Sequence, residues 1–345
     1  MKSLAVKYRP NTFEEVCGNQ VTVKILKRVL ELNKPKNAYL FAGPSGCGKT
    51  SLARIFANNL NAGIGEPIEL DAASNGNIEQ IRAIVESAKQ RSLTGTYKIY
   101  IIDECHAIST AGFQVFLKGL EETPEYTIFI FCTTEPNKIP ATILNRVQRF
   151  NISKIDNQEI KDRLVYICQQ EGFTNYEDTC ELISKLSNGG MREAITKLDQ
   201  CADLSADLSL ENSKLVLGEA PFERMMKLTN CLIGGNEQFT LAAIETLDQE
   251  GRDLKQFIDD YLSFVLELTK YILFKNINIT NIPAYLENNA DSMISVSYTT
   301  SFENALGWFN ALTNKLLEVK SMIKYDTSVK AVIEAYLLQV CRKQF

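Results

Sequence analysis

The sequence predicts an α/β fold with a mainly parallel sheet, followed by two helical parts. Residues 1–150 alternate short apolar strands with helical patterns, which is the order that a parallel sheet with crossover helices needs. From about Asn151 the strand signal stops, and helical periodicity continues to the end of the chain. The change of pattern indicates more than one domain, as the length of 345 residues also does.

Four segments of the first part have the composition of strands. They are Ala38–Ala42, Ile68–Leu70, Lys98–Ile102 and Thr127–Cys132. The last two lie in near-continuous runs of aromatic and β-branched residues, which are typical of strands buried on both faces. We therefore expect these two strands in the middle of the sheet.

Three short helices are predicted after the sheet domain. Asp156 can cap the first helix, Glu159 would complete a capping box, and Gly172 ends it. The second helix stops at Gly189-Gly190, where the third begins. Together these helices predict a small, lid-like bundle.

The remaining residues predict a separate helical domain. Ser205–Asn212 is rich in Ser and Asp, which is typical of a linker. Beyond it, apolar stripes at helical spacing start at Leu254 and Ala305. They indicate the core of a bundle, with a cofactor box as the alternative. We therefore divide the chain into a sheet domain (residues 1–152), a helical lid (153–206) and an all-helical domain (207–345).

Cysteine and histidine usage limits the chemistry. The nine Cys form no Cys-x-x-Cys motif, and no secretory leader or membrane-length apolar run is visible. We expect reduced thiols, a cytoplasmic protein, no membrane partner and no zinc. His106 is the single histidine, which nearly excludes histidine metal sites and Ser/His triads.

The charge is unevenly distributed. The net charge of −5 would by itself disfavour a nucleic-acid partner. Residues 1–150, however, carry 18 Lys/Arg and 14 Asp/Glu, a net charge of +4. Residues 151–345 carry 19 and 28, a net charge of −9. The sheet domain is therefore the part that suits an anionic partner.

The strongest motif is a glycine-rich loop between a strand and a helix, which matches G-x-x-x-x-G-K-[ST]. It comprises Gly43, Pro44, Ser45, Gly46, Cys47, Gly48, Lys49 and Thr50, with Ser51 next in the helix. Backbone N–H groups of such a loop surround phosphates. Lys49 would reach the β- and γ-phosphates, and the Thr50 hydroxyl would bind Mg²⁺. A chance glycine-rich turn is the alternative.

Two carboxylates follow the third predicted strand. Asp103 would hold Mg²⁺, and Glu104 would polarise the water that attacks the γ-phosphate. An ordinary acidic strand end is the alternative. His106, two positions later, could belong to a helicase-like box or could be a hydrogen-bonded histidine beside the site. We favour the second, because the helical remainder offers no strands for the second lobe of a helicase.

Further candidates each have an ordinary alternative. Thr133 or Thr134, at the tip of the next strand, could bond the γ-phosphate or the water, although Thr is common in strands. Arg146 could serve a neighbouring subunit as an arginine finger, or make a surface salt bridge. Arg192, at the start of a lid helix, could lean over the γ-phosphate, or be solvent-exposed.

These residues, taken in order, resemble the AAA+ clamp loader ATPases. The similar motifs are Lys7-Tyr8-Arg9-Pro10, Thr12–Val16, Gly18-Asn19-Gln20, Leu70–Ser74, Thr133–Pro140 and Gly190–Ala194. The later ones look more like the bacterial DNA polymerase III gamma/tau subunit than like replication factor C. The likeness covers about residues 3–202, and the helical remainder fits the family's collar domain in length and pattern only.

The resemblance implies an ATPase subunit of a ring-like pentamer that loads a sliding clamp onto primer–template DNA during DNA replication. ATP and Mg²⁺ would lie between subunits, with Arg146 as the finger in trans. Arg192 would be the lid sensor and Thr134 the first sensor, while Asp71 would restrain Glu104 until DNA binds. The residues expected near the adenine are Tyr8, Arg9, Pro10 and Val16.

The chain departs from the gamma/tau pattern at three places. Asn61–Glu66 replaces the family's four-cysteine zinc module, which supports the expectation of no zinc. Asn145 and Val147 replace the usual neighbours of the finger arginine. The sequence ends at Phe345, so we expect a compact form without the long tau extension.

DNA is expected on the inner face of the ring, through its phosphate backbone and without base readout. The candidate contacts are Lys138, Thr133, Asn77, Lys89 and Arg91. A solvated helix face is the alternative for the last two. Other functions that remain open are another AAA+ DNA-remodelling ATPase, such as a Holliday-junction motor, and an ATP-gated scaffold subunit.

Overall fold

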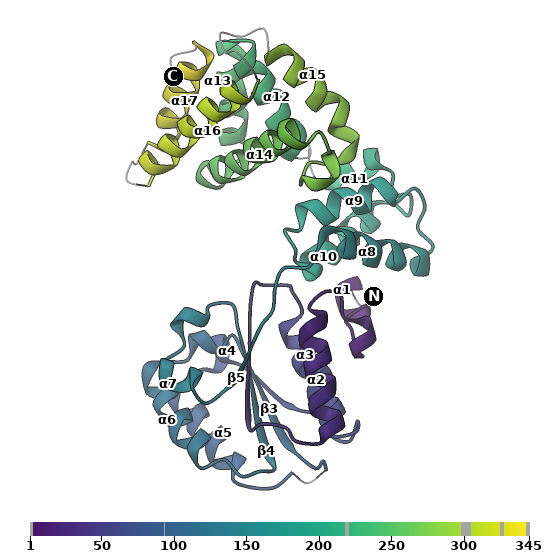
Figure 1. The fold of residues 1–345 in the computed structure, drawn as a ribbon, viewed down its shortest axis with the longest axis vertical. Helices are drawn as coiled ribbons and strands as arrows, with labels where there is room; N and C mark the ends of the chain where they lie inside the picture. The colour runs from purple at the N-terminus through teal and green to yellow at the C-terminus, as the bar shows by residue number, and fades with distance from the viewer. Residues whose placement is uncertain (1–2, 93, 218–220, 298–304, 325–327, 343–345) are drawn as a thin grey trace. The chain divides into compact units, whose positions relative to one another are not determined.

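The computed structural model describes residues 3–92, 94–217, 221–297, 305–324 and 328–342. It separates into two compact units, Met1–Leu208 and Ser209–Phe345. Every strand of the described residues lies in the first unit, and the second unit is helical wherever it is described. The predicted fold class, an α/β sheet domain followed by helical parts, is therefore confirmed (Figure 1).

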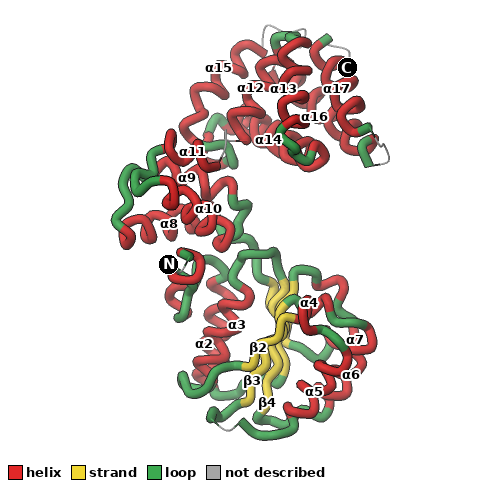
Figure 2. The backbone as a smooth tube through the Cα atoms, turned by 180° about the vertical axis from the view of Figure 1, so that it is seen from behind, coloured by secondary structure: helices red, strands yellow, loops and turns green. Residues whose placement is uncertain are grey.

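A parallel sheet forms the centre of the first unit. Its strands are β1 (Ala38–Ala42), β2 (Ile68–Asp71), β3 (Lys98–Asp103), β4 (Thr127–Thr133) and β5 (Gln148–Asn151). The order is β2-β3-β4-β1-β5, and each neighbouring pair is parallel. Figure 2 labels three of these strands, β2, β3 and β4. The third and fourth predicted strands are inner strands, as expected. The sequence did not predict β5, because this short edge strand buries only Phe150.

Helices cover both faces of the sheet. They are η1 (Phe13–Glu15), α2 (Gln20–Leu32), α3 (Lys49–Leu60), α4 (Ala72–Asn75), α5 (Ile78–Ala88), η2 (Cys105–Ala107), α6 (Thr110–Glu121), η3 (Pro136–Lys138) and α7 (Ala141–Leu144). The first helix, α1 (Leu4–Lys7), packs instead on the lid helix α10 (Met191–Leu204). Alternate residues of β1 enter opposite cores: Tyr39 packs with α2 and α3, and Leu40 packs with α5 and α6. Burial on both faces explains why the inner strands have no polar alternation.

The lid contains α8 (Asn157–Glu171), α9 (Glu177–Leu186) and α10 (Met191–Leu204). Asp156 caps α8 by accepting a hydrogen bond from Gln158 N at 2.8 Å, and Gly172 ends it with φ 76°. The predicted linker Ser205–Asn212 is too long. Leu208 is fully buried and donates its N–H to Thr174 O, and the next helix begins at Leu210. The boundaries drawn at residues 152 and 206 stay predictions.

The second unit is a helical bundle. Its helices are α11 (Leu210–Leu217), α12 (Pro221–Ile233), α13 (Glu237–Gln249), α14 (Leu254–Phe274), η4 (Ile277–Ile279), η5 (Ala284–Leu286), α15 (Glu287–Ser297), α16 (Ala305–Met322) and α17 (Val329–Cys341). The two predicted apolar stripes lie on α14 and α16 and pack into one core around Trp308. They are therefore bundle core, which was the preferred interpretation of the pattern.

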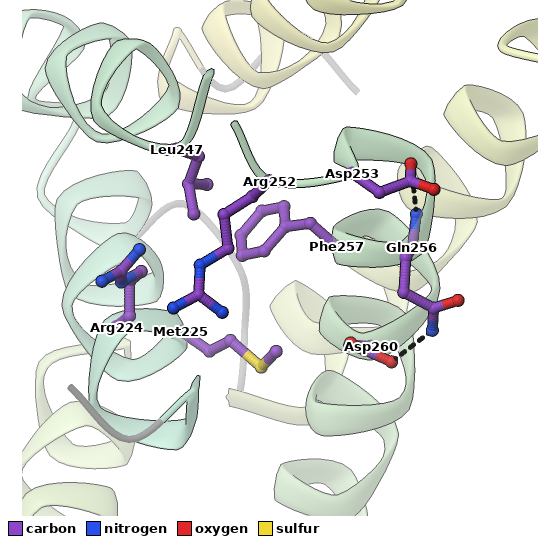
Figure 3. Close-up of a pocket in the computed structure, with 8 residues that line it drawn as sticks. All are labelled: Arg224, Met225, Leu247, Arg252, Asp253, Gln256, Phe257 and Asp260. Atoms are coloured by element: carbon purple, nitrogen blue, oxygen red, sulfur yellow. Dashed lines mark hydrogen bonds between the residues drawn. The ribbon is translucent and has the colours of Figure 1, made fainter. Parts of the chain in front are cut away.

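A pocket of about 230 Å³ opens on this bundle (Figure 3). Its lining residues are Arg224, Met225, Leu247, Arg252, Asp253, Gln256, Phe257 and Asp260. Both guanidinium groups already contact one carboxylate oxygen, Glu250 Oε2, at 2.6 Å from Arg224 and 3.4 Å from Arg252. Asp253 and Asp260 also line the pocket, so that with Glu250 three carboxylates accompany the two guanidinium groups, and no positive charge is left uncompensated for a ligand.

Candidate nucleotide-binding site

The glycine-rich loop connects the end of β1 to the start of α3, as predicted. Gly43 must be glycine, because a Cβ at this position would lie 2.0 Å from the Ile152 carbonyl oxygen. Gly48 directly precedes α3 with φ 94°, a conformation that favours glycine. The loop thus leads directly into the N-terminal end of a 12-residue helix. Backbone N–H groups and the helix dipole at this end favour the binding of phosphate.

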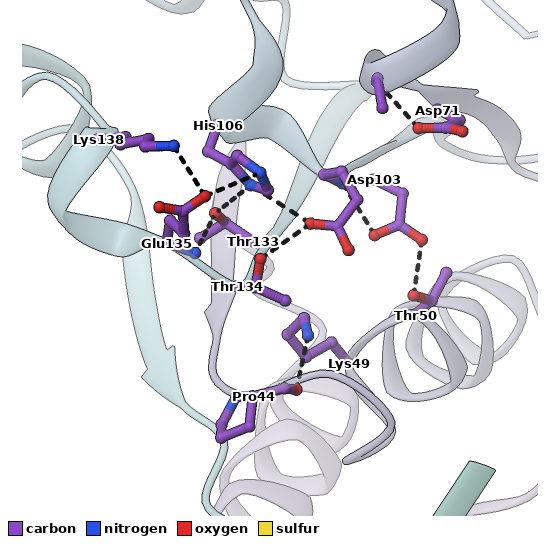
Figure 4. Close-up of polar contacts among 12 residues, drawn as sticks. Pro44, Lys49, Thr50, Asp71, Asp103, His106, Thr133, Thr134, Glu135 and Lys138 are labelled. Atoms are coloured by element: carbon purple, nitrogen blue, oxygen red, sulfur yellow. Dashed lines mark hydrogen bonds and ion pairs between the residues drawn. The ribbon is translucent and has the colours of Figure 1, made fainter. Parts of the chain in front are cut away.

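The side chains of Lys49 and Thr50 lie at the start of α3. Lys49 is 6% exposed, and its Nζ donates to the Pro44 carbonyl oxygen at 2.8 Å. Thr50 Oγ1 donates to Asp103 Oδ2 at 2.8 Å, across from α3 to the end of β3 (Figure 4). The fold therefore joins two motifs that are 53 positions apart in sequence.

The Thr50 and Asp103 oxygens fit an Mg²⁺ site. Mg²⁺ prefers hard oxygen ligands and takes one or two from the protein, completing its shell with water and substrate phosphates. These two oxygens provide that partial set beside the phosphate loop. Among the described residues, no cluster of three or more His, Cys, Asp or Glu side chains forms a metal site.

Glu104 follows Asp103 in a left-handed backbone conformation, with φ 46° and ψ 42°. Its N–H donates to Asp103 Oδ1 at 3.0 Å, which ties the turn to the strand end. Such a conformation is costly for a residue with a side chain, and it is common at functional sites. Glu104 Oε2 accepts a hydrogen bond from Thr134 Oγ1 at 3.2 Å. The predicted catalytic glutamate and first sensor therefore meet.

His106 is bound on several sides, as the interpretation of a histidine beside the site requires. Its Nδ1 lies 3.1 Å from Thr133 Oγ1 and 3.3 Å from Glu104 Oε2, and its Nε2 lies 3.4 Å from Glu135 Oε1 (Figure 4). The sequence did not single out Glu135. The available signal was that Glu135 lies two residues after Thr133, in the segment that directly follows β4.

The N-terminal residues expected near the adenine divide between the lid and α3. The Tyr8 hydroxyl donates to Glu171, and burial together with this bond raises the pKa of Tyr8 to about 12. Arg9 Nε donates to Ser51 Oγ at 3.3 Å, which places this arginine beside the phosphate loop. Pro10 lies half-buried next to it. Val16 instead packs in the apolar core with α2 and α3.

The two candidate arginines are placed differently. Arg192 is the second residue of α10, and its backbone N donates to the Gly46 carbonyl oxygen at 3.4 Å. The lid arginine therefore lies against the phosphate loop. Arg146 lies on the surface, where it pairs with Glu121 at 2.6 Å and donates to Thr142 O. This chain does not bring Arg146 to its own site.

The Asp71 carboxylate does not hold Glu104. It caps α4 instead, accepting from Ala73 N at 3.0 Å and from Ser74 Oγ at 3.1 Å. No hydrogen bond joins Asp71 to Glu104 in the described structure, so the expected restraint from this position is not observed. The side-chain partners of Glu104 are Thr134, directly after β4, and His106 of η2.

The predicted DNA contacts do not form one group. Asn77, the cap of α5, and Lys138 lie near the carboxyl ends of the strands. Lys89 and Arg91 lie at the opposite edge: Lys89 O accepts from Tyr126, directly before β4, and Arg91 lies over the Tyr126 ring. The prediction that Thr133 contacts DNA is wrong. It is fully buried, and its hydroxyl contacts His106 and Glu135 N, so it cannot reach DNA.

The comparisons with known proteins agree with this arrangement. A family model described as "DNA polymerase III, delta subunit" matches residues 67–156. The tau subunit of DNA polymerase III from Bacillus subtilis is 38% identical over 286 residues, which cover 76% of this chain and 51% of the relative. This chain is similar to the DNA polymerase III tau and gamma/tau subunits.

The similarity extends to other gamma/tau relatives. The tau subunit from Escherichia coli is 30% identical over 76% of this chain and 44% of its own length. The chain thus spans about half the length of the curated relatives that it matches. A solved structure of the Thermotoga maritima RuvB branch migration motor has a TM-score of 0.52 at 20% identity, covering 71% of this chain and 86% of that one. This likeness supports the fold alone.

One finding bears on membrane association. No helix within the described residues combines the length and the apolar character that a membrane crossing needs.

Proposed function

We propose that this chain is the ATPase subunit of a clamp loader, which opens a sliding clamp and places it on primer–template DNA. One observation carries the proposal: Thr50 Oγ1 and Asp103 Oδ2 lie 2.8 Å apart and join the phosphate loop to the end of β3, which Glu104 follows. This arrangement suits Mg²⁺-dependent hydrolysis of a nucleoside triphosphate. It occurs in a chain similar to tau subunits over about three quarters of its length.

The phosphate loop would bind ATP through its backbone and Lys49. The Lys49 ammonium lies over the loop at the Pro44 carbonyl, from which it can turn toward the β- and γ-phosphates. Thr50 and Asp103 would hold Mg²⁺. The ion, when bound, supplies Lewis-acid stabilisation of the phosphate charge.

Glu104 would accept the proton of the attacking water. Thr134, bonded to Glu104 Oε2, would orient this carboxylate and contact the γ-phosphate or the water. Arg192 would sense the phosphates from the lid, because its backbone already contacts Gly46. Arg146, exposed and away from its own site, would complete the site of a neighbouring subunit.

The partners follow from the same proposal. They are further clamp loader subunits, in a homo- or hetero-pentamer, the sliding clamp, and the phosphate backbone of DNA. The helical unit Ser209–Phe345 would serve as the collar that holds the ring together. An ATP-gated scaffold would use the same collar without turnover.

The test is steady-state ATP turnover by the chain with its partner subunits. We expect clamp and primer–template to raise the rate, and Lys49→Ala to abolish both nucleotide binding and turnover. Lys34→Ala, at an exposed lysine outside the site, is the matched control. A rate that responds to neither clamp nor DNA contradicts clamp loading. Assembly that depends on ATP without turnover, followed by light scattering, would support the scaffold instead.

A further inference from the structure

The Arg146 side chain is anchored by two neighbouring helices. Arg146 follows α7 and lies beside the end of α6, and these helices pack against each other (Figure 1). Its backbone N donates to Ile143 O at 2.8 Å. Its guanidinium donates from Nη1 to Thr142 O at 2.9 Å and from Nη2 to Glu121 Oε1 at 2.6 Å. The side chain therefore has a defined direction, although 39% of it is exposed.

Both acceptors of the guanidinium lie at the C-terminal ends of helices. Glu121 is the last residue of α6, and Thr142 belongs to the four-residue helix α7. Carbonyl groups at such an end lack intrahelical partners and attract a cation. A carboxylate at the same end is disfavoured by the helix dipole. The place of Glu121 is therefore explained by its contact with Arg146, and not by the stability of α6.

Most of the donor capacity of Arg146 stays available. A guanidinium has five N–H donors in a planar fork. Two of them are used by Glu121 and Thr142, and the other three have no acceptor among the residues that the structure describes. A fork anchored on one side presents its remaining N–H groups in a fixed direction. Such an array suits the oxygens of a phosphoryl group, which a guanidinium can bind in a bidentate way.

We propose that Glu121 is a positioning residue for Arg146, and that it holds the guanidinium ready for the triphosphate bound by a neighbouring subunit. The inference rests on the proposed clamp loader function, in which Arg146 is a finger in trans. An unanchored arginine loses much rotamer freedom when it docks on phosphate. The contact with Glu121 removes part of this cost before docking. Since the ion pair is exposed, it contributes little to folding stability, and its effect should appear in turnover.

Two replacements of Glu121 separate orientation from charge. Glu121→Gln keeps an oxygen that can accept from Arg146 Nη2, whereas Glu121→Ala removes the acceptor. We expect Glu121→Ala to lower kcat at least ~5-fold with little change in nucleotide affinity, because the finger loses its direction and keeps its charge. Glu121→Gln should retain most of the wild-type kcat. Glu122→Ala, at the same helix end and 3.8 Å from Lys89, is the matched control and should keep full turnover.

A double-mutant cycle distinguishes positioning from a general structural effect. If Glu121 acts through Arg146, Glu121→Ala should cause no further loss in the Arg146→Ala background. A general structural effect would lower the residual turnover of Arg146→Ala by the same factor as that of the wild type. The thermal unfolding midpoint of each variant shows whether it is folded.

The measurements are kcat and nucleotide affinity in the complex with partner subunits, clamp and primer–template. Unchanged kcat in Glu121→Ala overturns the inference alone, and so does an equal loss with and without Arg146. A higher kcat in Glu121→Ala would show that the carboxylate restrains the finger, which also overturns it. A wild-type complex without ATP turnover overturns the proposed function and the inference together.

Discussion

Glu104 is the residue on which the proposed chemistry depends most directly. Its left-handed backbone, tied to Asp103 Oδ1, points the chain from the sheet into η2, and its side chain meets Thr134 from the next strand. The conformation is one that the surrounding contacts must maintain, since a non-glycine residue adopts it at a cost.

We expect Glu104→Gln to bind ATP normally and to hydrolyse it at least ~100-fold more slowly, because the amide cannot take a proton from water. Gln has almost the same shape and can still accept a hydrogen bond from Thr134. Single-turnover hydrolysis and fluorescent-nucleotide binding, measured on the same preparation, separate the two effects. Near-normal turnover would remove Glu104 from the role of general base.

Lys138 is the candidate DNA contact that lies nearest the site and is also exposed. Reversing its charge with Lys138→Glu should weaken DNA-stimulated turnover and lower the salt dependence of DNA binding by about one phosphate contact. Lys34→Glu changes the net charge equally, far from the carboxyl end of the sheet, and should leave the response intact. Equal effects of both variants would show that only net charge matters.

At the level of elements, helix ends decide how the two units are built. Asp156 caps α8, and Asp253 caps α14 by accepting from Lys255 N at 2.8 Å and Gln256 N at 3.2 Å (Figure 3). The 21-residue helix α14 carries much of the apolar face of the second unit. Its first turn therefore matters to the stability of the whole bundle.

Replacing the α14 cap should destabilise the second unit without touching the nucleotide site. We expect Asp253→Ala to lower the free energy of unfolding of this unit by about 1 kcal/mol, because two N–H groups lose their acceptor. Asp253→Asn is the matched control, since Asn caps helices about as well as Asp. Urea unfolding followed by circular dichroism measures both. A full-sized loss in the Asn variant would point to the charge of Asp253 and not to capping.

At the level of the whole molecule, the proposal requires more than one chain for each active site. Arg146 pairs with Glu121 on its own surface and does not approach its own phosphate loop. A lone chain would therefore bind nucleotide without completing the site, which makes turnover a property of the assembly.

Mixing two inactive variants tests this directly. Arg146→Ala should keep nucleotide binding and lose at least ~100-fold in turnover, because finger arginines contribute that much or more. Lys49→Ala should lose nucleotide binding. In mixed assemblies an intact phosphate loop of the first variant meets an intact Arg146 of the second, so turnover should reappear. If the mixture stays inactive while both variants assemble, the finger does not act between copies of this chain.

Much of the fold followed from local pattern alone. The apolar runs around β3 and β4 predicted inner strands because both faces of such strands are covered, and the loop from Gly43 to Thr50 predicted the strand–loop–helix around it. Asp156 and Gly172 predicted the two ends of α8, since caps are properties of single residues. β5 was missed because an edge strand needs little apolar surface of its own.

The sequence by itself predicted which residues are candidates for phosphate and acid–base chemistry, because loop geometry and strand ends are local. Only the tertiary structure decided which of them meet. Parallel strand order brings the ends of β1, β3 and β4 together, so Thr50 meets Asp103, and Thr134 and His106 both meet Glu104. The same packing buried Thr133 away from DNA and turned Asp71 into a helix cap. Contacts between segments distant in sequence depend on register and packing, which local spacing does not encode.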